Sequence, residues 1–199
     1  MVELLESAVN QVQLGGWVMY PLIFTSLWMW FLIGKKVVDL YAFTKGDQPF
    51  IKLKEDIGKA DISAAAWQKY IISGYLEERT GNRDLDESIL ESHQIHLEQF
   101  VTKYTGTIGL LATVAPLLGL LGTVSGMVKT FTVIAEFGTG NARALASGIS
   151  EALITTQTGL VVAVPGLFLA SFLLRRSSGL LERMHRFCLR LSRAHLDAV

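Results

Sequence analysis

The sequence predicts an all-α integral membrane protein with three transmembrane helices, of which the second and third extend into the cytoplasm as long helices. Half of the 199 residues are hydrophobic and only 18% are charged, which is less charge than a soluble domain of this size usually carries. The apolar residues form three blocks, and the charged residues lie between and after them. A bilayer is crossed by about 20 apolar helical residues, and each block approaches or exceeds that length.

The first apolar block covers residues 16–33 and contains no charge. Its length is near the lower limit for a membrane-spanning helix. Trp17 and Tyr20 are side chains that settle at membrane interfaces, and Pro21 falls in the first turns, where its missing N–H matters least. A cleaved signal peptide is the alternative interpretation. It would require a basic leading region, but residues 1–16 contain no Lys or Arg.

The second and third blocks cover residues 107–128 and 145–174. The third exceeds the thickness of the hydrocarbon core, so it should tilt or project into water. Lys and Arg near the ends of spans favour the cytoplasmic side. They follow the first block, precede the second and follow the third, at Lys35, Lys36, Lys103, Arg175 and Arg176. The N-terminus is therefore expected to face outward, and the 34–106 segment and the C-terminal tail to be cytoplasmic.

This organisation divides the chain into seven expected segments. They are an outward N-terminal segment (1–15), three transmembrane helices (16–34, 107–130 and 146–174), a cytoplasmic helical loop (35–106), a short periplasmic connection (131–145) and a cytoplasmic C-terminal helix (175–199).

Turn residues subdivide the expected cytoplasmic loop. Gly46 to Pro49 marks a turn, and Gly81-Asn82 marks a break. Between them, Asp61-Ile-Ser63 offers a helix N-cap. From Asp84 onward the apolar spacing is helical, and no breaker precedes Gly106. That helix is therefore expected to run directly into the second span.

The C-terminal tail is also amphipathic and is expected to continue the third span. Its apolar positions include Met184, Phe187 and Cys188, and its arginines lie elsewhere on the helix. An ordinary solvated helix is one interpretation. The other is that Arg183 and Arg186 meet anionic lipid or the acids of the loop. Cys188 is the single cysteine, so an intrachain disulfide is excluded.

Small residues line one face of the second span. Gly119, Gly122 and Gly126 recur at i, i+3 and i+7, a spacing that permits close approach of a neighbouring helix in lipid. Pro116 and Pro165 lie inside the second and third spans. Each removes a helical hydrogen bond, and the freed carbonyl must be satisfied by neighbouring groups. These five residues are the expected helix-packing positions.

The third span carries an ionisable residue, Glu151. Such a group is costly inside a membrane and should face the bundle interior or a water-filled path. Thr155 and Thr158 share its helical face, and Thr156 widens the polar sector. A row of hydroxyls with one carboxylate would suit a partner helix that carries an ion-binding acid. The alternative is that Glu151 lies at the outer membrane edge and is simply solvated.

Two stretches carry a specific resemblance. APLLGLLGTVSGMVKTF (115–131) and GISEALITTQTGLVVAVPG (148–166) resemble the two membrane signatures of the ExbB/TolQ/MotA proton channel family. The match is close over roughly the last half of the chain, and the rest agrees in layout only. The ExbB and TolQ branches are nearer than MotA, because MotA has four spans.

The resemblance implies a bacterial inner-membrane motor subunit. It implies a homopentamer around two copies of an ExbD/TolR-like single-span partner, which carries the ion-binding aspartate and acts on a TonB-like energy transducer. Positions Thr123, Glu151 and Thr156 match the family's polar pore positions, and Thr155 and Thr158 flank them. The transported ion is H⁺ or Na⁺, and no cofactor is implied.

Other functions remain as alternatives. Within the family, the chain could serve a TolQ-like Tol-Pal system or a gliding motor. Outside it, the chain could be a passive scaffold for a single-span partner, which should tolerate loss of the polar row. An enzyme is not expected: His93 and His96 lack further ligands nearby, and no phosphate-binding glycine loop is present. The formal net charge of zero gives no information about acidic or nucleic-acid partners, and no nucleic-acid partner is expected.

Overall fold

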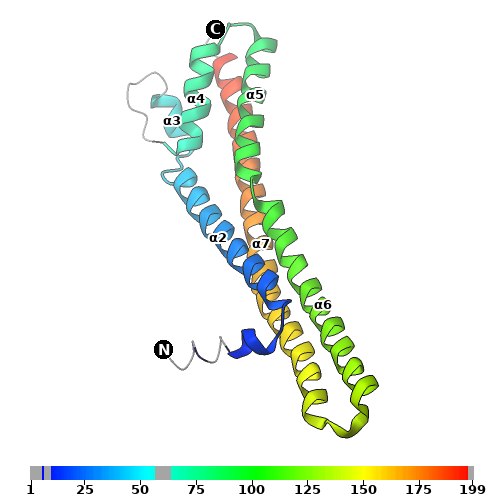
Figure 1. The fold of residues 1–199 in the computed structure, drawn as a ribbon. Helices are drawn as coiled ribbons and strands as arrows, with labels where there is room; N and C mark the ends of the chain where they lie inside the picture. The colour runs from blue at the N-terminus through cyan, green and yellow to red at the C-terminus, as the bar shows by residue number, and fades with distance from the viewer. Residues whose placement is uncertain (1–5, 7–9, 57–63, 197–199) are drawn as a thin grey trace. The chain divides into compact units, whose positions relative to one another are not determined.

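The computed structural model describes residues 6, 10–56 and 64–196 (Figure 1). Within these residues the regular structure is helical, as the predicted all-α class requires. The elements are α2 (Met19–Thr44), α3 (Phe50–Asp56), α4 (Ala66–Glu78), α5 (Arg83–Thr102), α6 (Thr105–Phe137), a 3₁₀ turn (Gly138–Gly140) and α7 (Ala142–Leu196). In the described part, three helical stretches are long and apolar enough to cross a membrane: α2, the run that contains α6, and α7. The predicted fold class is confirmed.

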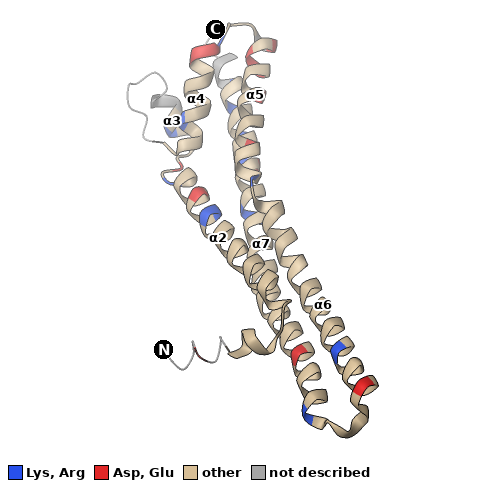
Figure 2. Ribbon diagram, in the orientation of Figure 1, with Lys and Arg blue, Asp and Glu red and all other residues tan. Residues whose placement is uncertain are grey.

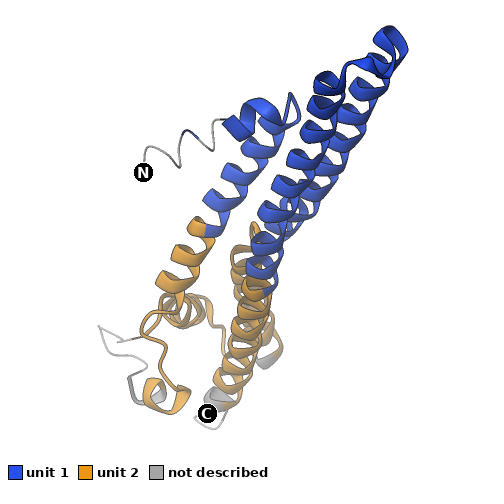
Figure 3. Cartoon of the chain, turned by 90° about the horizontal axis from the view of Figure 1, so that it is seen from below, with its two compact units in different colours: residues 1–33, 106–171 blue, residues 34–105, 172–199 orange. Residues whose placement is uncertain are grey.

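The chain forms two compact units. Unit 1 contains residues 1–33 and 106–171, and unit 2 contains residues 34–105 and 172–199 (Figure 3). Helices α2 and α7 each contribute one segment to unit 1 and one segment to unit 2. The three apolar stretches fall largely in unit 1, and most of the charged residues fall in unit 2 (Figure 2).

Unit 1 is built on an antiparallel hairpin of α6 and α7. The two helices are joined by Gly138–Asn141. Gly138 has a φ of 67°, a left-handed conformation that glycine adopts without steric cost. The Asn141 side chain accepts a hydrogen bond from the backbone N–H of Ala144 at 3.2 Å and caps α7. Helices α6 and α7 therefore both continue into the 131–145 segment that hydropathy predicts to lie outside the membrane, because a helix can continue after its apolar residues end.

The α2 segment of unit 1 contacts this hairpin through fully buried side chains. Leu22 and Met29 are both 0% exposed. A Cβ placed on Gly166 of α7 would lie 2.6 Å from the Met29 sulfur, so the absence of a side chain there lets α2 approach. On the outer surface of the same unit, large apolar side chains such as Phe24, Leu117 and Phe168 are exposed. Exposed apolar surface of this extent marks a face that contacts lipid or a neighbouring subunit.

Unit 2 has a separate hydrophobic core. Trp67 of α4 contacts Phe187 of α7 edge to face, with ring centroids 5.3 Å apart. Helices α4 and α5 approach closely where Gly74 faces the His93 ring. The core is completed by buried residues from α2 to α5 and α7, including Leu40, Leu53, Ile71, Ile72, Leu90, Leu97, Leu180, Met184 and Leu191.

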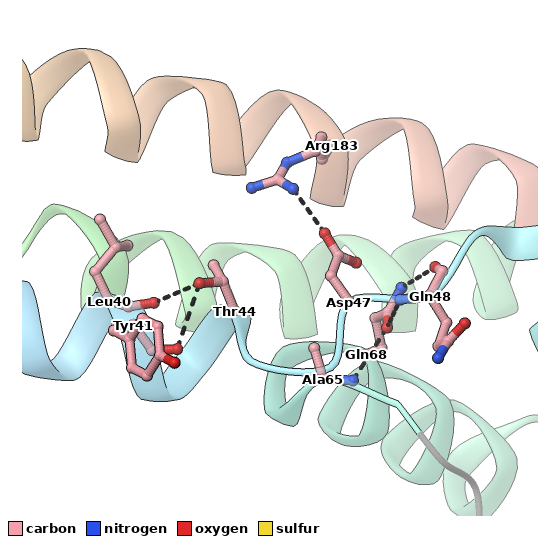
Figure 4. Close-up of polar contacts among 8 residues, drawn as sticks. All are labelled: Leu40, Tyr41, Thr44, Asp47, Gln48, Ala65, Gln68 and Arg183. Atoms are coloured by element: carbon pink, nitrogen blue, oxygen red, sulfur yellow. Dashed lines mark hydrogen bonds and ion pairs between the residues drawn. The ribbon is translucent and has the colours of Figure 1, made fainter.

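A short turn follows α2 and leads to α3. The turn also contacts α7 through the side chain of Asp47 (Figure 4). Gly46 has a φ of 84°, which confirms the predicted turn. The Asp47 carboxylate accepts a hydrogen bond from Arg183 at 2.6 Å. Arg186 instead bonds to Glu182 on its own helix, also at 2.6 Å. Of the two interpretations of the tail, the structure therefore favours a contact between Arg183 and an acid of the loop.

The side chain of Gln68 fixes the start of α4 against the same turn (Figure 4). Its amide oxygen accepts hydrogen bonds from the backbone N–H groups of Gln48 and Ala65, both at 3.1 Å. Its amide nitrogen donates to the Gln48 carbonyl at 2.7 Å. The N-cap expected at Asp61–Ser63 lies outside the described residues, and the structure begins α4 after Ala65.

The remaining boundaries are partly as predicted. The break at Gly81-Asn82 is confirmed, and Asn82 caps α5 by accepting a hydrogen bond from the N–H of Asp84 at 3.1 Å.

The prediction of an uninterrupted helix from Asp84 into the second span is wrong at one point. The helix is broken between α5 and α6, where Tyr104 has a φ of 68°. The ammonium groups of Lys35 and Lys103 lie over the Tyr104 ring, at 5.1 and 5.0 Å from its centroid. The contact with Lys35 is a tertiary contact and has no local sequence signal.

The single cysteine provides a test of the unit 2 core. Cys188 lies in α7 beyond the apolar 145–174 block, and burial raises the pKa of its thiol from 9.0 to about 11. Because the thiolate is the reactive form, its fraction at pH 8 should be about a hundredfold below that of a free thiol. We expect labelling by iodoacetamide to be correspondingly slow in the folded protein and rapid after denaturation in SDS. Rapid labelling of the folded protein would contradict a closed core around α7.

Candidate functional site in the hairpin of helices α6 and α7

The glycines of α6 lie against α7 at very short range. A Cβ placed on Gly126 would be 2.6 Å from the carbonyl oxygen of Gly148 and 2.8 Å from the backbone nitrogen of Ala152. A Cβ on Gly119 would be 3.1 Å from the Thr155 carbonyl oxygen. These neighbours are backbone atoms, which cannot rotate away. The two helices therefore depend on the absence of side chains at these positions.

Thr155 and Thr156 lie at this contact but differ in their surroundings. Thr155 is 0% exposed; it packs against Gly122, and its hydroxyl donates to carbonyls of its own helix at 3.0 Å. Thr156 is half-buried, and its hydroxyl is 3.2 Å from the Gly119 carbonyl of α6 and 3.1 Å from the Ala152 carbonyl. Thr156 is thus the hydroxyl that links the two helices.

The other two candidate threonines bond within their own helices. Thr123 donates to the carbonyl of Leu120 at 2.7 Å, and Thr158 donates to that of Ile154 at 2.8 Å. Both side chains are half-buried. A hydroxyl that satisfies its donor in this way still offers its oxygen as an acceptor to a passing ion or water.

Glu151 forms an ion pair across the hairpin. Its Oε2 accepts a hydrogen bond from the Lys129 ammonium of α6 at 2.9 Å. The Glu151 side chain is 10% exposed, whereas that of Lys129 is 59% exposed. Because Glu151 is buried and paired in the single chain, it is not simply solvated. The pair joins α6 to α7 in the half of the hairpin nearer the connection.

The chain that precedes α2 covers the same carboxylate. Gly16 has a φ of 70°, and a Cβ there would overlap Oε1 of Glu151. Next to it, the indole N–H of Trp17 donates to the Ser125 hydroxyl of α6 at 3.2 Å. Glu151 is therefore enclosed by three segments of unit 1: the turn before α2, α6 and α7.

Two residues of this site were missed by sequence reasoning, Lys129 and Gly16. In the sequence, Lys129 is only a basic residue just after the second apolar block. A signal was available, since Lys129 and Glu151 are equally distant in sequence from Gly140 in the connection. An antiparallel hairpin brings such positions together. Gly16 had no comparable signal, because its contact with Glu151 depends on how α2 enters unit 1.

The structure also places the two prolines within the spans and the histidine pair that the sequence singled out. Pro116 and Pro165 lie inside α6 and α7, and neither ends its helix. In unit 2, His93 lies 3.4 Å from the Glu78 carboxylate and contacts the Tyr70 ring edge to face. Among the described residues, no three His, Cys, Asp or Glu side chains lie close enough together to hold a metal ion.

The fold and the site define a class of protein. Long apolar helices with an apolar exterior, joined by an ion pair whose carboxylate is buried, are the architecture of a multi-pass integral membrane protein. Residues 58–186 match the model of the MotA/TolQ/ExbB proton channel family. This match covers more than half of the chain and includes both signature stretches, so the chain belongs to that family.

Individual relatives are similar at moderate identity. A biopolymer transport protein ExbB of Aquifex aeolicus is 42% identical over 80 residues, which are 40% of this chain and 54% of that protein. The ExbB of Xanthomonas campestris pv. campestris is 34% identical over 149 residues, 70% of this chain and 54% of that protein. The ExbB of Salmonella typhimurium is 33% identical over 101 residues, 51% of this chain and 39% of that protein. The chain thus spans about half the length of these relatives, or less.

Proposed function

We propose that this chain is the ring-forming subunit of an ion-driven motor in the bacterial inner membrane. Five copies would surround two copies of a single-span partner of the ExbD/TolR type, which carries the ion-binding acid. The observation that carries the proposal is the family match over residues 58–186, which contains both α6 and the polar part of α7. The N-terminus would be periplasmic and the C-terminus cytoplasmic, as the lysines and arginines near the span ends favour.

The polar row of the hairpin would form the wall of the ion path. Thr123, Thr156 and Thr158 offer hydroxyl oxygens, and Thr155 would support them from the α6–α7 contact. Glu151 would stand at the outward end, its charge balanced by Lys129. A charge buried in a membrane without a partner is costly, so Lys129 allows the Glu151 carboxylate to remain ionised. A carboxylate neutralised in this way also binds a passing cation less strongly than a free one would.

The energy available sets the scale of the mechanical step. Moving one elementary charge across 100 mV releases about 2.3 kcal/mol, enough for one modest conformational change per ion. The proposed work is done on a TonB-like envelope partner, for outer-membrane transport. The apolar exterior of unit 1 would supply contacts to neighbouring copies as well as to lipid.

Native mass spectrometry after co-purification tests the assembly. The chain is expressed with the small single-span protein encoded beside it, and the mass of the detergent-solubilised complex is measured. Five copies with two of the partner would support the motor. A chain that purifies alone as a monomer would contradict it and would favour a passive scaffold.

Thr156→Ala is expected to reduce ion flux through the assembled complex at least tenfold, since it removes the hydroxyl between Gly119 and α7. The measurement is ion flux into proteoliposomes under an imposed potential. Thr113→Ala is the matched control, because Thr113 is an exposed threonine of α6 whose hydroxyl bonds only its own helix in the described contacts, at 2.8 Å to Leu110. Equal flux in both variants, with the complex intact, would indicate a scaffold.

A further inference from the structure

Three lysines of unit 2 surround one small cavity. Lys35 and Lys36 of α2, together with Lys103 and Tyr104 between α5 and α6, line a space of about 200 Å³. Asp39 and Phe100 complete the lining. With three ammonium groups and one carboxylate, the lining carries an excess of two positive charges. Among the described residues, none of the three lysines forms an ion pair with a carboxylate.

Lys36 is the most unusual of the three. It is only 3% exposed, and its ammonium donates to the backbone carbonyl of Val101 at 2.5 Å. An ammonium has three N–H donors, and the described contacts give this one a single neutral acceptor. The Asp39 carboxylate of the same lining attracts it electrostatically but forms no ion pair with it in the described residues. A buried charge is stable only when it is paired. An anion in the cavity would supply that partner.

The other groups around the cavity favour an anion as well. The ammonium groups of Lys35 and Lys103 both lie over the Tyr104 ring, at 5.1 and 5.0 Å from its centroid, and repel one another. Helix α6 begins at the next residue, Thr105. The first N–H groups of a helix have no partner within it, and that end carries partial positive charge. A bound anion would relieve the repulsion and meet the helix end.

The place of the cluster along the chain identifies the kind of anion. Lys35 and Lys36 directly follow the first apolar block, and Lys103 and Tyr104 lie just before the second. These are the ends of consecutive spans, so both lie at the same membrane surface. Tyrosine and lysine at span ends settle at the level of the lipid headgroups. Basic pockets beside transmembrane helices at the cytoplasmic surface are typical sites for anionic headgroups.

We propose that the cavity formed by Lys35, Lys36 and Lys103 binds the phosphodiester headgroup of an anionic phospholipid. The lipid would link α2, at Lys35 and Lys36, to the break between α5 and α6. The break itself would then be part of the site, because Tyr104, which has the left-handed conformation, holds its ring close to both exposed lysines. This proposal rests on the residues of unit 2 and does not depend on the motor function.

The test is lipid binding by native mass spectrometry of the full-length protein in a non-ionic detergent. Phosphatidylglycerol and phosphatidylcholine with identical acyl chains are titrated separately. We expect tighter binding of phosphatidylglycerol. Lys103→Gln should weaken it about fivefold, the change that corresponds to about 1 kcal/mol per basic residue near a membrane surface. Lys35→Gln should have a similar effect, and the double variant should lose about 25-fold.

Lys45→Gln is the matched control, since Lys45 is an exposed lysine at the end of α2 that does not line the cavity. It should bind phosphatidylglycerol as the unaltered protein does. Equal binding of the two lipids, or an equal loss in all three single variants, would overturn the proposal.

Inorganic phosphate at millimolar concentration is added as a separate competitor. If it displaces the lipid and its own binding is lost in the Lys103 variant, the site is for soluble phosphate and the lipid assignment is wrong.

Discussion

Lys129→Ala is expected to destabilise the protein more than Glu151→Ala does, although both remove the same ion pair. The Glu151 side chain is 10% exposed, so without Lys129 its carboxylate stays buried and unpaired. Loss of a hydrogen bond to a buried charged group costs about 1.5–3 kcal/mol. The Lys129 side chain is 59% exposed; without Glu151 its ammonium returns to water, and the loss should be nearer that of a surface pair, about 1 kcal/mol or less. The measurement is thermal unfolding in detergent.

The double variant and the charge swap separate this pairing from other effects. Lys129→Ala with Glu151→Ala should be more stable than Lys129→Ala alone, because no buried charge remains. Lys129→Glu with Glu151→Lys tests whether the pair can be reversed, and a double-mutant cycle gives the coupling. If the two single variants lose equal stability and the double variant loses their sum, the ion pair contributes nothing. Under the proposed function, Glu151→Ala should also stop ion flux while it remains more stable than Lys129→Ala.

Gly126→Ala is expected to separate α6 from α7. The added Cβ would lie 2.6 Å from the Gly148 carbonyl oxygen and 2.8 Å from the Ala152 nitrogen. Both are backbone atoms, so one of the helices must shift. Overpacking of this kind typically costs about 1–3 kcal/mol. Thermal unfolding in detergent, together with the yield of assembled complex, measures the effect.

Gly109→Ala is the matched control on the same helix, because a Cβ there would meet nothing within 4 Å. It should be neutral or slightly stabilising, as alanine favours a helix more than glycine does. Gly122→Ala offers a finer test: there the added Cβ would overlap the Thr155 side chain. Thr155→Ala should restore part of the loss at Gly122 but none at Gly126. Equal stability of the Gly126 and Gly109 variants would contradict the close contact of the two helices.

The sequence alone determined the number of apolar helices and the main features of the hairpin. Three charge-poor blocks have one stable solution in a membrane, because a helix satisfies its own backbone within lipid. The glycine spacing in the second block gave the face on which a neighbouring helix approaches. Glu151 was singled out because an ionisable residue in an apolar block is rare. Each of these inferences depends on residues that are close together in the chain.

The tertiary structure decided which groups meet across the chain. Lys129 pairs with Glu151, and Gly16 covers it, only because α6, α7 and the turn before α2 converge in unit 1. The break at Tyr104 lies where its ring contacts Lys35 of α2, and no glycine or proline stands at positions 103–104 to mark it. Hydrophobic periodicity reports which face of a helix is apolar, whereas pairing of charges and departures from helical geometry depend on partners that are distant in sequence. For that reason the helices could be predicted from the sequence, and the hairpin offered a signal for the ion pair. The covering of Glu151 by Gly16 and the lysine cavity could not be predicted.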